Sequence, residues 1–140
     1  MLRSEAGRLP LDRVEDALRT PSVRLLALSS VEFGSGFRQD LAALGGLCRE
    51  RGVLFCVDAI QSLGCFPLDV EACGIDFLSA DGHKWLLPVE GCGIFFCTRG
   101  VLDCVAPRVV GWHSVTDDTA FEVSAIPSWG RPCASDGYLR

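Results

Sequence analysis

Four side chains in the middle of the sequence have the types that imine chemistry requires. Asp58 and Gln61 stand three residues apart, and His83 and Lys84 are adjacent. A lysine amine can form an imine with an aldehyde, and a carboxylate can keep a nitrogen heterocycle protonated. An imidazole can donate a hydrogen bond to a phosphate, and a side-chain amide can donate one to a phenolic oxygen. This set predicts a site for a phosphorylated aldehyde.

Both pairs follow segments that we expect to be buried strands. Asp58 ends the apolar run 53–57, and the stretch 79–85 follows a shorter predicted strand at 75–79. Ligands of open α/β sheets bind outside the carboxyl ends of the strands, so we expect both pairs on one rim of the sheet. A desolvated strand end would make it easier to keep Asp58 anionic and Lys84 reactive.

The remaining pattern predicts an α/β fold, a mostly parallel sheet flanked by helices. Helical spacing of apolar residues predicts helices over 11–18 and from about 38 to 51, and Gly52 is the natural end of the second helix. Apolar runs predict two further strands, one at 23–28 and one at 93–97. We expect the strand at 23–28 to be covered on both faces.

Pyridoxal 5'-phosphate (PLP) is a cofactor that needs all four groups. Its aldehyde requires a lysine, its ring nitrogen a carboxylate, its phenolic oxygen a donor, and its phosphate several donors. Each residue taken singly has an ordinary explanation, because an aspartate at a strand end often caps a turn and a lysine is usually a solvated charge. Their joint placement is what predicts the cofactor.

From about residue 7 to residue 115, the sequence resembles the class V aminotransferase family, which includes cysteine desulfurases, kynureninases and isopenicillin-epimerase-like proteins. The matching stretches are 52–62 and 81–86, the second of which is followed by 90–93. The resemblance implies part of the large domain of a PLP-dependent fold-type I transferase or lyase. It also implies a small-molecule amino acid as substrate and a homodimer for the full-length family.

The resemblance implies a role for each matching residue. Lys84 would form the Schiff base with the cofactor, the internal aldimine, and would move protons once the substrate displaces it. Asp58 would pair with the pyridinium nitrogen. Gln61 would bond the phenolic oxygen, and His83 would donate to the phosphate.

The sequence departs from the family pattern at three places. Asp81 stands where many relatives have a phosphate-binding serine, and because a carboxylate repels a phosphate we expect Asp81 to face another group. Phe33 stands where desulfurases carry an asparagine that helps to bind the substrate carboxylate, which argues against cysteine as the substrate. Pro88 and Val89 replace a Gly-Pro pair.

The relatives are considerably longer than 140 residues. They have an upstream glycine-rich phosphate loop, a stacking aromatic residue and a downstream domain with a substrate-binding arginine, which we do not find here. We therefore expect a partial PLP-binding large domain over 1–122 and an irregular or disordered tail over 123–140. The alternative is a truncated, non-catalytic remnant that binds the cofactor weakly or not at all. A dinucleotide-binding domain with Asp58 on a ribose is a third interpretation. The glycines at 34–36 form only part of the pattern that it requires, and the spacing to Asp58 supports it weakly.

Composition argues against several other classes of function. The net charge of -5 and the scattered basic residues argue against a nucleic-acid or membrane partner. No apolar stretch approaches the roughly 20 residues that span a bilayer, and the first residues lack a signal-peptide core, so we expect a cytoplasmic protein. The eight cysteines form no CxxC pair and no zinc-ligand spacing, so we expect reduced packing cysteines and no metal site.

Overall fold

The structure is a computed structural model that describes residues 4–87, 89–102 and 105–106. The chain divides into two units, one ending at Thr98 and one beginning at Arg99. The described residues of the first unit form two helices and four strands: α1 (Leu11–Leu18), β1 (Leu25–Ser29), α2 (Leu41–Arg51), β2 (Leu54–Asp58), β3 (Phe77–Asp81) and β4 (Gly93–Cys97). The second unit contributes the short helix α3 (Arg99–Leu102). The predicted boundary at residue 122 and the tail that follows it lie outside the described residues.

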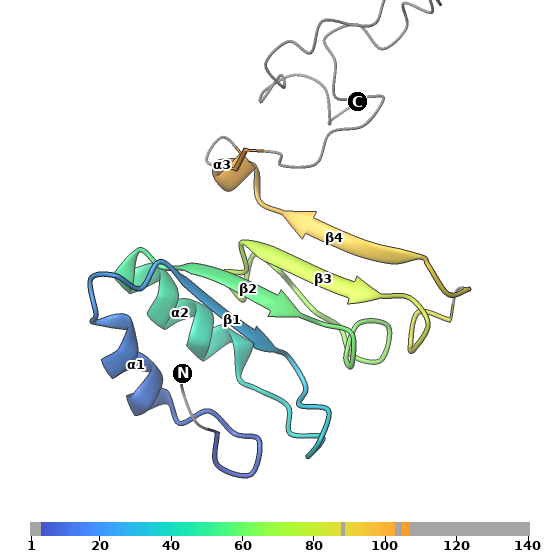
Figure 1. Cartoon of the computed structure of the whole chain (residues 1–140), viewed down its shortest axis with the longest axis horizontal. Helices are drawn as coiled ribbons and strands as arrows, with labels where there is room; N and C mark the ends of the chain where they lie inside the picture. Colours follow the sequence, from blue (N-terminus) through green and yellow to red (C-terminus); the bar gives the residue numbers. More distant parts are fainter. Residues whose placement is uncertain (1–3, 88, 103–104, 107–140) are drawn as a thin grey trace, which may run out of the picture. The chain divides into compact units, whose positions relative to one another are not determined.

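The four strands form one sheet in the order β1-β2-β3-β4 (Figure 1). β1 and β3 both pair with β2 in parallel, and β4 is antiparallel to β3. The predicted fold class, a mostly parallel α/β sheet with flanking helices, is confirmed. One row of the register matters for the site, since Asp58 lies opposite Ser29 on one side and Ser79 on the other.

The two helices differ in how well the sequence located them. α1 has the predicted bounds, 11–18, with Val14 and Leu18 buried. α2 begins at Leu41, so the prediction of a start near residue 38 was wrong. The reason is the Asp40 side chain, which accepts a hydrogen bond from the Ala43 N–H at 3.0 Å and so caps the helix at that point.

The third strand lies two residues later than predicted. β3 covers Phe77–Asp81 instead of 75–79, because the Ile75 N–H donates to the carbonyl of Val70 at 2.9 Å and so closes the preceding turn. Pairing with β4 then continues to the end of β3, where Asp81 lies opposite Gly93. Asp81 is therefore a strand residue. The fourth strand has the predicted bounds.

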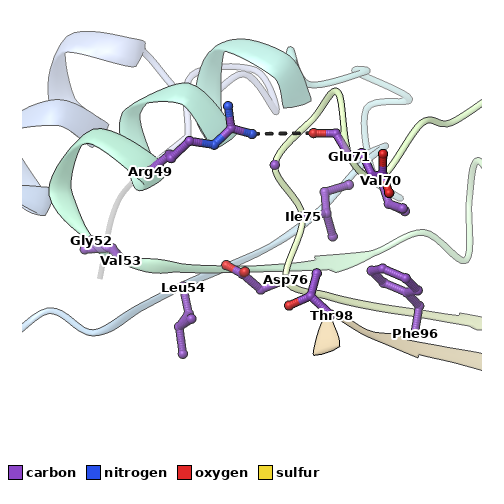
Figure 2. Close-up of a pocket in the computed structure, with 11 residues that line it drawn as sticks. Arg49, Gly52, Val53, Leu54, Val70, Glu71, Ile75, Asp76, Phe96 and Thr98 are labelled. Carbon is purple, nitrogen blue, oxygen red and sulfur yellow. Dashed lines mark hydrogen bonds between the residues drawn. The ribbon is translucent and has the colours of Figure 1, made fainter. Parts of the chain in front are cut away.

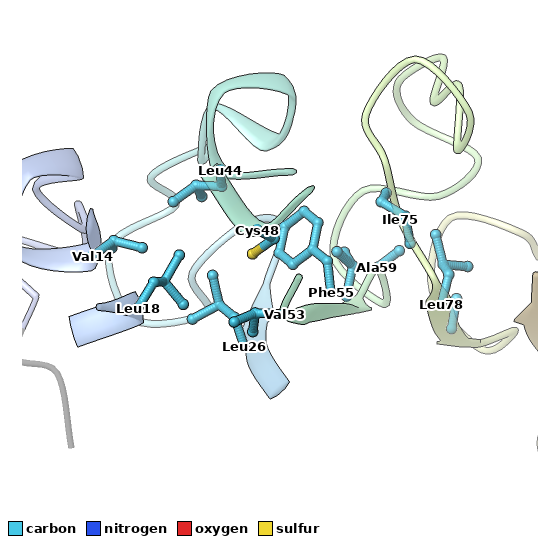
Figure 3. Close-up of a cluster of buried hydrophobic side chains, with 12 residues drawn as sticks. Val14, Leu18, Leu26, Leu44, Cys48, Val53, Phe55, Ala59, Ile75 and Leu78 are labelled. Atoms are coloured by element: carbon cyan, nitrogen blue, oxygen red, sulfur yellow. The ribbon is translucent and has the colours of Figure 1, made fainter. Parts of the chain in front are cut away.

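The core lies between the sheet and the two helices, which cover one of its faces (Figures 1 and 3). Leu44 of α2 and Phe55 of β2 are among the fully buried side chains, and Val14 of α1 is buried in the same cluster. Burial of each such side chain contributes about 1.5–3 kcal/mol to folding. This cluster is what fixes β2 relative to α2.

We call the opposite side of the sheet the open face. Alternate strand residues place their side chains on it: Leu25, Ala27, Leu54, Cys56, Phe77 and Phe95. Leu25 is 48% exposed and Phe95 is 72% exposed. The prediction that the strand near 23–28 is covered on both faces was therefore wrong. The physical reason is that α1 and α2 both pack on the other face.

No disulfide links the cysteines that the structure describes, and their reduced state stays a prediction: Cys48, Cys56, Cys65, Cys73, Cys92 and Cys97. Cys48 is buried within the core cluster. Cys104 and Cys133 lie outside the described residues. Within the part of the chain that is described, no helix is long and apolar enough to cross a membrane.

Candidate active site

Asp58 is the last residue of β2, and its position at the strand end is held by its own backbone and side chain. The Asp58 carbonyl accepts a hydrogen bond from the Ser30 N–H at 2.8 Å. One carboxylate oxygen, Oδ1, accepts from the Ile60 N–H at 2.9 Å. Within the described residues, the other oxygen accepts no hydrogen bond from the protein, so it can accept one from a ligand. The side chain lies on the open face, in the row of Ser29 and Ser79.

Gln61 lies in the turn that follows Asp58, and a pair of buried serines holds this turn. The hydroxyls of Ser30 and Ser62 lie 2.6 Å apart, and both residues are buried. One of the two hydroxyls donates to the other, and the hydroxyl that accepts can donate to a backbone carbonyl: Ser30 Oγ lies 3.2 Å from the Asp58 carbonyl, and Ser62 Oγ lies 3.3 Å from that of Ala59. The pair therefore ties the end of β1 to the turn of the candidate site. Sequence reasoning missed it, because nothing distinguishes these serines from exposed ones.

Lys84 lies in the segment that begins directly after β3. The Gly82 N–H donates to the Cys92 carbonyl at 2.7 Å, which anchors this segment to the residues before β4. The Lys84 side chain is half-buried, and its Nζ lies 5.5 Å from the centre of the Phe33 ring. No carboxylate pairs with Lys84 among residues 4–87, 89–102 and 105–106. Phe33, one of the departures from the family pattern, is thus a neighbour of the lysine.

The turn with Gln61 and the segment with Lys84 are in direct contact. A Cβ atom added to Gly64 would lie 2.8 Å from the carbonyl oxygen of Trp85, so the two backbones touch. Both segments also leave from the carboxyl ends of neighbouring parallel strands, β2 and β3. The prediction that the two pairs of residues share one rim of the sheet is therefore confirmed.

Asp81 faces His83, while the expectation that this carboxylate points away from a bound phosphate stays a prediction. His83 Nδ1 lies 3.1 Å from Asp81 Oδ1, and both side chains are partly exposed. The hydrogen bond from the His83 side chain lowers the pKa of the Asp81 carboxyl below its usual value.

The expected desolvation of the site is absent in the case of Asp58. Its side chain is exposed, whereas the half-buried Lys84 and Gln61 are partly shielded from water. The physical reason is the same as for β1: the helices lie on the face of the sheet away from Asp58. That expectation was wrong for Asp58.

A cavity of about 510 Å³ lies at the other end of the sheet, between the start of β2, the start of β3 and the end of β4 (Figure 2). The Asp76 carboxylate at its wall already accepts from the Phe55 N–H at 2.8 Å. Arg49 donates to the Glu71 carbonyl at 3.4 Å. The candidate site residues do not line this cavity, and its polar groups hold the fold together.

Comparison with known proteins identifies the family. The family model for aminotransferase class-V matches residues 2–125. The cysteine desulfurase IscS of Shewanella denitrificans is 40% identical over 93 residues, which are 66% of this chain and 22% of that protein. The chain therefore spans about a fifth of the length of this curated relative.

Two solved structures resemble the fold closely. The apo cysteine desulfurase of Thermococcus onnurineus superposes with a TM-score of 0.76 at 27% identity, over 82% of this chain and 28% of that chain. The alanine–glyoxylate aminotransferase of Nostoc superposes with a TM-score of 0.63 at 34% identity, over 67% of this chain and 25% of that chain. The sheet and its helices are thus part of the large domain of a fold-type I transferase. The chain belongs to the class V aminotransferase family, whose members are PLP-dependent enzymes.

Proposed function

We propose that this chain is the PLP-binding portion of a class V aminotransferase-like enzyme that acts on an amino acid, with Lys84 as the residue that forms the Schiff base. The proposal rests on one observation: Asp58 ends β2, Lys84 follows the neighbouring parallel strand β3, and the turn after β2 touches the segment of Lys84 at Gly64. It predicts that the amine and the carboxylate lie within reach of a single pyridine ring.

The residues present fit this cofactor. Asp58 has one carboxylate oxygen that accepts no described hydrogen bond, which leaves it available for a protonated ring nitrogen. Gln61 is half-buried, and among the described residues its amide makes no hydrogen bond to the protein, so it can donate to a phenolic oxygen. When bound, the cofactor would withdraw electrons from the substrate's α-carbon. Lys84 would hold the cofactor and carry the proton to and from that carbon.

Lys84 is the only lysine in the sequence, which makes the test unambiguous. The chain is incubated with PLP, reduced with borohydride and digested, and the modified peptide is identified by mass spectrometry. We expect a stable adduct on Lys84, together with an absorbance near the edge of the visible range before reduction. The Lys84→Arg variant keeps the charge but cannot form the imine, so it should lose both signals. If the Lys84→Arg variant traps as much PLP as the native chain does, through its terminal amine, the proposal is overturned.

Asp58→Asn provides the second variant. An amide cannot keep a ring nitrogen protonated as a carboxylate does, so we expect this variant to bind PLP more weakly and with a shifted absorbance maximum. Asp40→Asn changes a carboxylate of the same size at the start of α2 and should leave the spectrum unchanged. A spectrum that is identical in Asp58→Asn and the native chain contradicts the proposed role of Asp58.

The alternative is a non-catalytic remnant that binds PLP weakly or not at all. The exposure of Asp58 and the small fraction of the curated relative that the chain spans favour it. Each contact to the cofactor that is missing would remove about 1–3 kcal/mol of binding, so a micromolar affinity could become millimolar. A spectroscopic titration with PLP separates the two, since saturation in the micromolar range excludes the remnant.

The substrate is proposed to be a small-molecule amino acid. The cysteine desulfurase relatives make cysteine one candidate, whereas Phe33 in place of the expected asparagine argues against it. Adding cysteine and alanine in turn to the PLP-loaded chain and following the absorbance tests this point: we expect no preference for cysteine in the native chain. The full-length enzyme is proposed to be a homodimer, which sedimentation of such a protein would test.

A further inference from the structure

Asp81 and His83 form a side-chain pair at the carboxyl end of β3. Asp81 is the last residue of β3 and lies opposite Gly93 of β4. A Cβ on Gly93 would lie 3.1 Å from the Ala80 carbonyl oxygen, so the two strands approach closely at this point. The same Asp81 oxygen that faces His83 Nδ1 at 3.1 Å is also 3.5 Å from the His83 backbone nitrogen. The sheet thus holds the backbone of Asp81, and the carboxylate of Asp81 faces both the imidazole and the backbone nitrogen of His83.

When Nδ1 of an imidazole is hydrogen-bonded to a carboxylate, the protonation state of the ring decides whether Nε2 can donate a hydrogen bond. An ionised carboxylate only accepts hydrogen bonds, so Nδ1 must carry a proton to bond it. A neutral ring then has a bare Nε2, which accepts hydrogen bonds and cannot donate one to a phosphate. Only the doubly protonated, cationic ring can bond a carboxylate through Nδ1 and a phosphate through Nε2 at the same time.

We propose that Asp81 is a positioning residue that holds Nδ1 of His83 and thereby makes Nε2 a cationic hydrogen-bond donor to the 5'-phosphate of PLP. This inference rests on the proposed function. It gives a physical reason for a carboxylate where many relatives have a serine. A serine hydroxyl can donate to the phosphate directly, whereas Asp81 would act through the imidazole, and a charge-assisted hydrogen bond is roughly twice as strong as a neutral one.

The other charged groups around the pair leave this arrangement intact. Asp81 is the one carboxylate that pairs with His83 in the part of the chain that the structure describes. The neighbouring Lys84 amine lies against the Phe33 ring. Two further contacts to the pair's own segment are made by backbone atoms, between Gly82 and Cys92 and between Trp85 and Gly64, and carry no charge.

The first test needs no cofactor. Nitrogen-15 NMR of the imidazole reports which ring nitrogen carries the proton, and the sequence has only two histidines, so a His83→Gln variant assigns the signal. At a pH where the ring is neutral, we expect the proton on Nδ1 in the native chain and on Nε2 in Asp81→Ala. Asp81→Asn keeps an oxygen that can accept from Nδ1 and should restore the native tautomer. The same tautomer in the native chain and in Asp81→Ala overturns the inference.

The second test compares PLP with pyridoxal, which lacks the phosphate. At the same pH, we expect both ring nitrogens to be protonated in the PLP complex and only one in the pyridoxal complex. Asp81→Asn, which removes the charge, should weaken PLP binding about tenfold and leave pyridoxal binding unchanged. Equal losses for the two ligands, or a singly protonated ring in the PLP complex, overturn the donor role of Nε2.

The outcomes separate this inference from the proposed function. A chain that traps PLP on Lys84 but shows no effect of Asp81 on the tautomer or on PLP affinity retains the proposed function and loses the inference. A chain that traps no PLP on Lys84 loses the proposed function and the donor role together. In that case the tautomer measurement still decides whether Asp81 orients the ring.

Discussion

Gly64 lies against the backbone of Trp85, so closely that a Cβ at position 64 would fall 2.8 Å from the Trp85 carbonyl oxygen and 2.9 Å from its carbonyl carbon. Gly64 also has a φ of +91°, a backbone conformation that other residues adopt only with strain. Glycine is therefore needed at this position for two independent reasons. The contact joins the turn that carries Gln61 to the segment that carries Lys84, which makes it a test of how the candidate site is assembled.

Gly64→Ala should lower both stability and PLP uptake. The positive φ alone costs about 1–2 kcal/mol, and the clash with Trp85 adds a cost of similar size. Gly91→Ala is the matched control, since Gly91 has a φ of +85° but no neighbouring atom within 4 Å of the place that a Cβ would take. Urea unfolding of both variants gives the two free energies. Equal losses at both positions would contradict a specific role for the Gly64–Trp85 contact.

Replacing each of two adjacent glycines of α2 with alanine should change the stability of the protein in opposite directions. A Cβ on Gly45 would overlap the Cys73 carbonyl oxygen, whereas a Cβ on Gly46 would meet no atom within 4 Å. Gly46→Ala should therefore stabilise the helix by about 0.5–1 kcal/mol, because alanine loses less backbone entropy. Gly45→Ala should destabilise the protein, since α2 must move away from the loop at Cys73. Thermal unfolding checks both signs, and a stabilised Gly45→Ala would refute the packing described for α2.

Removing one hydroxyl of the Ser30–Ser62 pair should cost more than removing the second. Ser62→Ala removes one hydrogen-bond partner of the buried Ser30 hydroxyl, which keeps the Asp58 carbonyl, at a cost of about 0.5–1.5 kcal/mol. The double variant removes both polar groups, so its destabilisation should be smaller than the sum of the two single variants. A double-mutant cycle from urea unfolding measures this difference. Strict additivity would mean that the 2.6 Å hydrogen bond contributes nothing.

The buried thiol of Cys48 should make stability fall at alkaline pH. Burial, together with the nearby Asp76 charge, raises the pKa of Cys48 from 9.0 to about 11. The unfolded chain therefore releases this proton at lower pH than the folded chain does, and the stabilising contribution is complete below pH 9 and is lost as pH rises toward 11.

Alkylation followed by mass spectrometry provides a direct measurement of the same thiol. In the folded chain at pH 8, iodoacetamide should modify the exposed Cys65 and Cys92 well before Cys48. In urea all three should react at similar rates. A Cys48→Ala variant controls for the alkaline loss of stability, since it should show a weaker dependence on pH between 9 and 11. Fast modification of Cys48 in the folded state would contradict its burial.

The sequence located elements best where the local signal and the tertiary contacts agree. The helix at 11–18 and the strand at 93–97 have their predicted bounds. The start of α2 was misplaced because the apolar spacing, which begins at Leu41, does not mark the first helical residue, whereas the Asp40 cap does. The third strand was misplaced because its limits depend on pairing with β4, which is a long-range contact that no local pattern encodes.

The candidate site was predictable in position but not in environment. A strand that ends at an aspartate, with a second strand that leads to a His-Lys pair, is a sequence pattern, and the sheet brings the two together. The exposure of Asp58 could not be predicted, because it depends on which face of the sheet the helices cover. The Ser30–Ser62 hydrogen bond and the Asp81–His83 pair each depend on side-chain geometry at a scale of about 3 Å.

The open face should affect how the purified chain behaves in solution. An aromatic ring as exposed as that of Phe95, which stacks with the Phe77 ring at a centroid distance of 6.4 Å, is a surface on which fluorescent dyes and other polypeptides adsorb. Purification yield should therefore depend on concentration and improve with mild detergent or arginine in the buffer. Replacing Phe95 with threonine would keep the strand and reduce this stickiness without disturbing the side of the sheet on which the core is built.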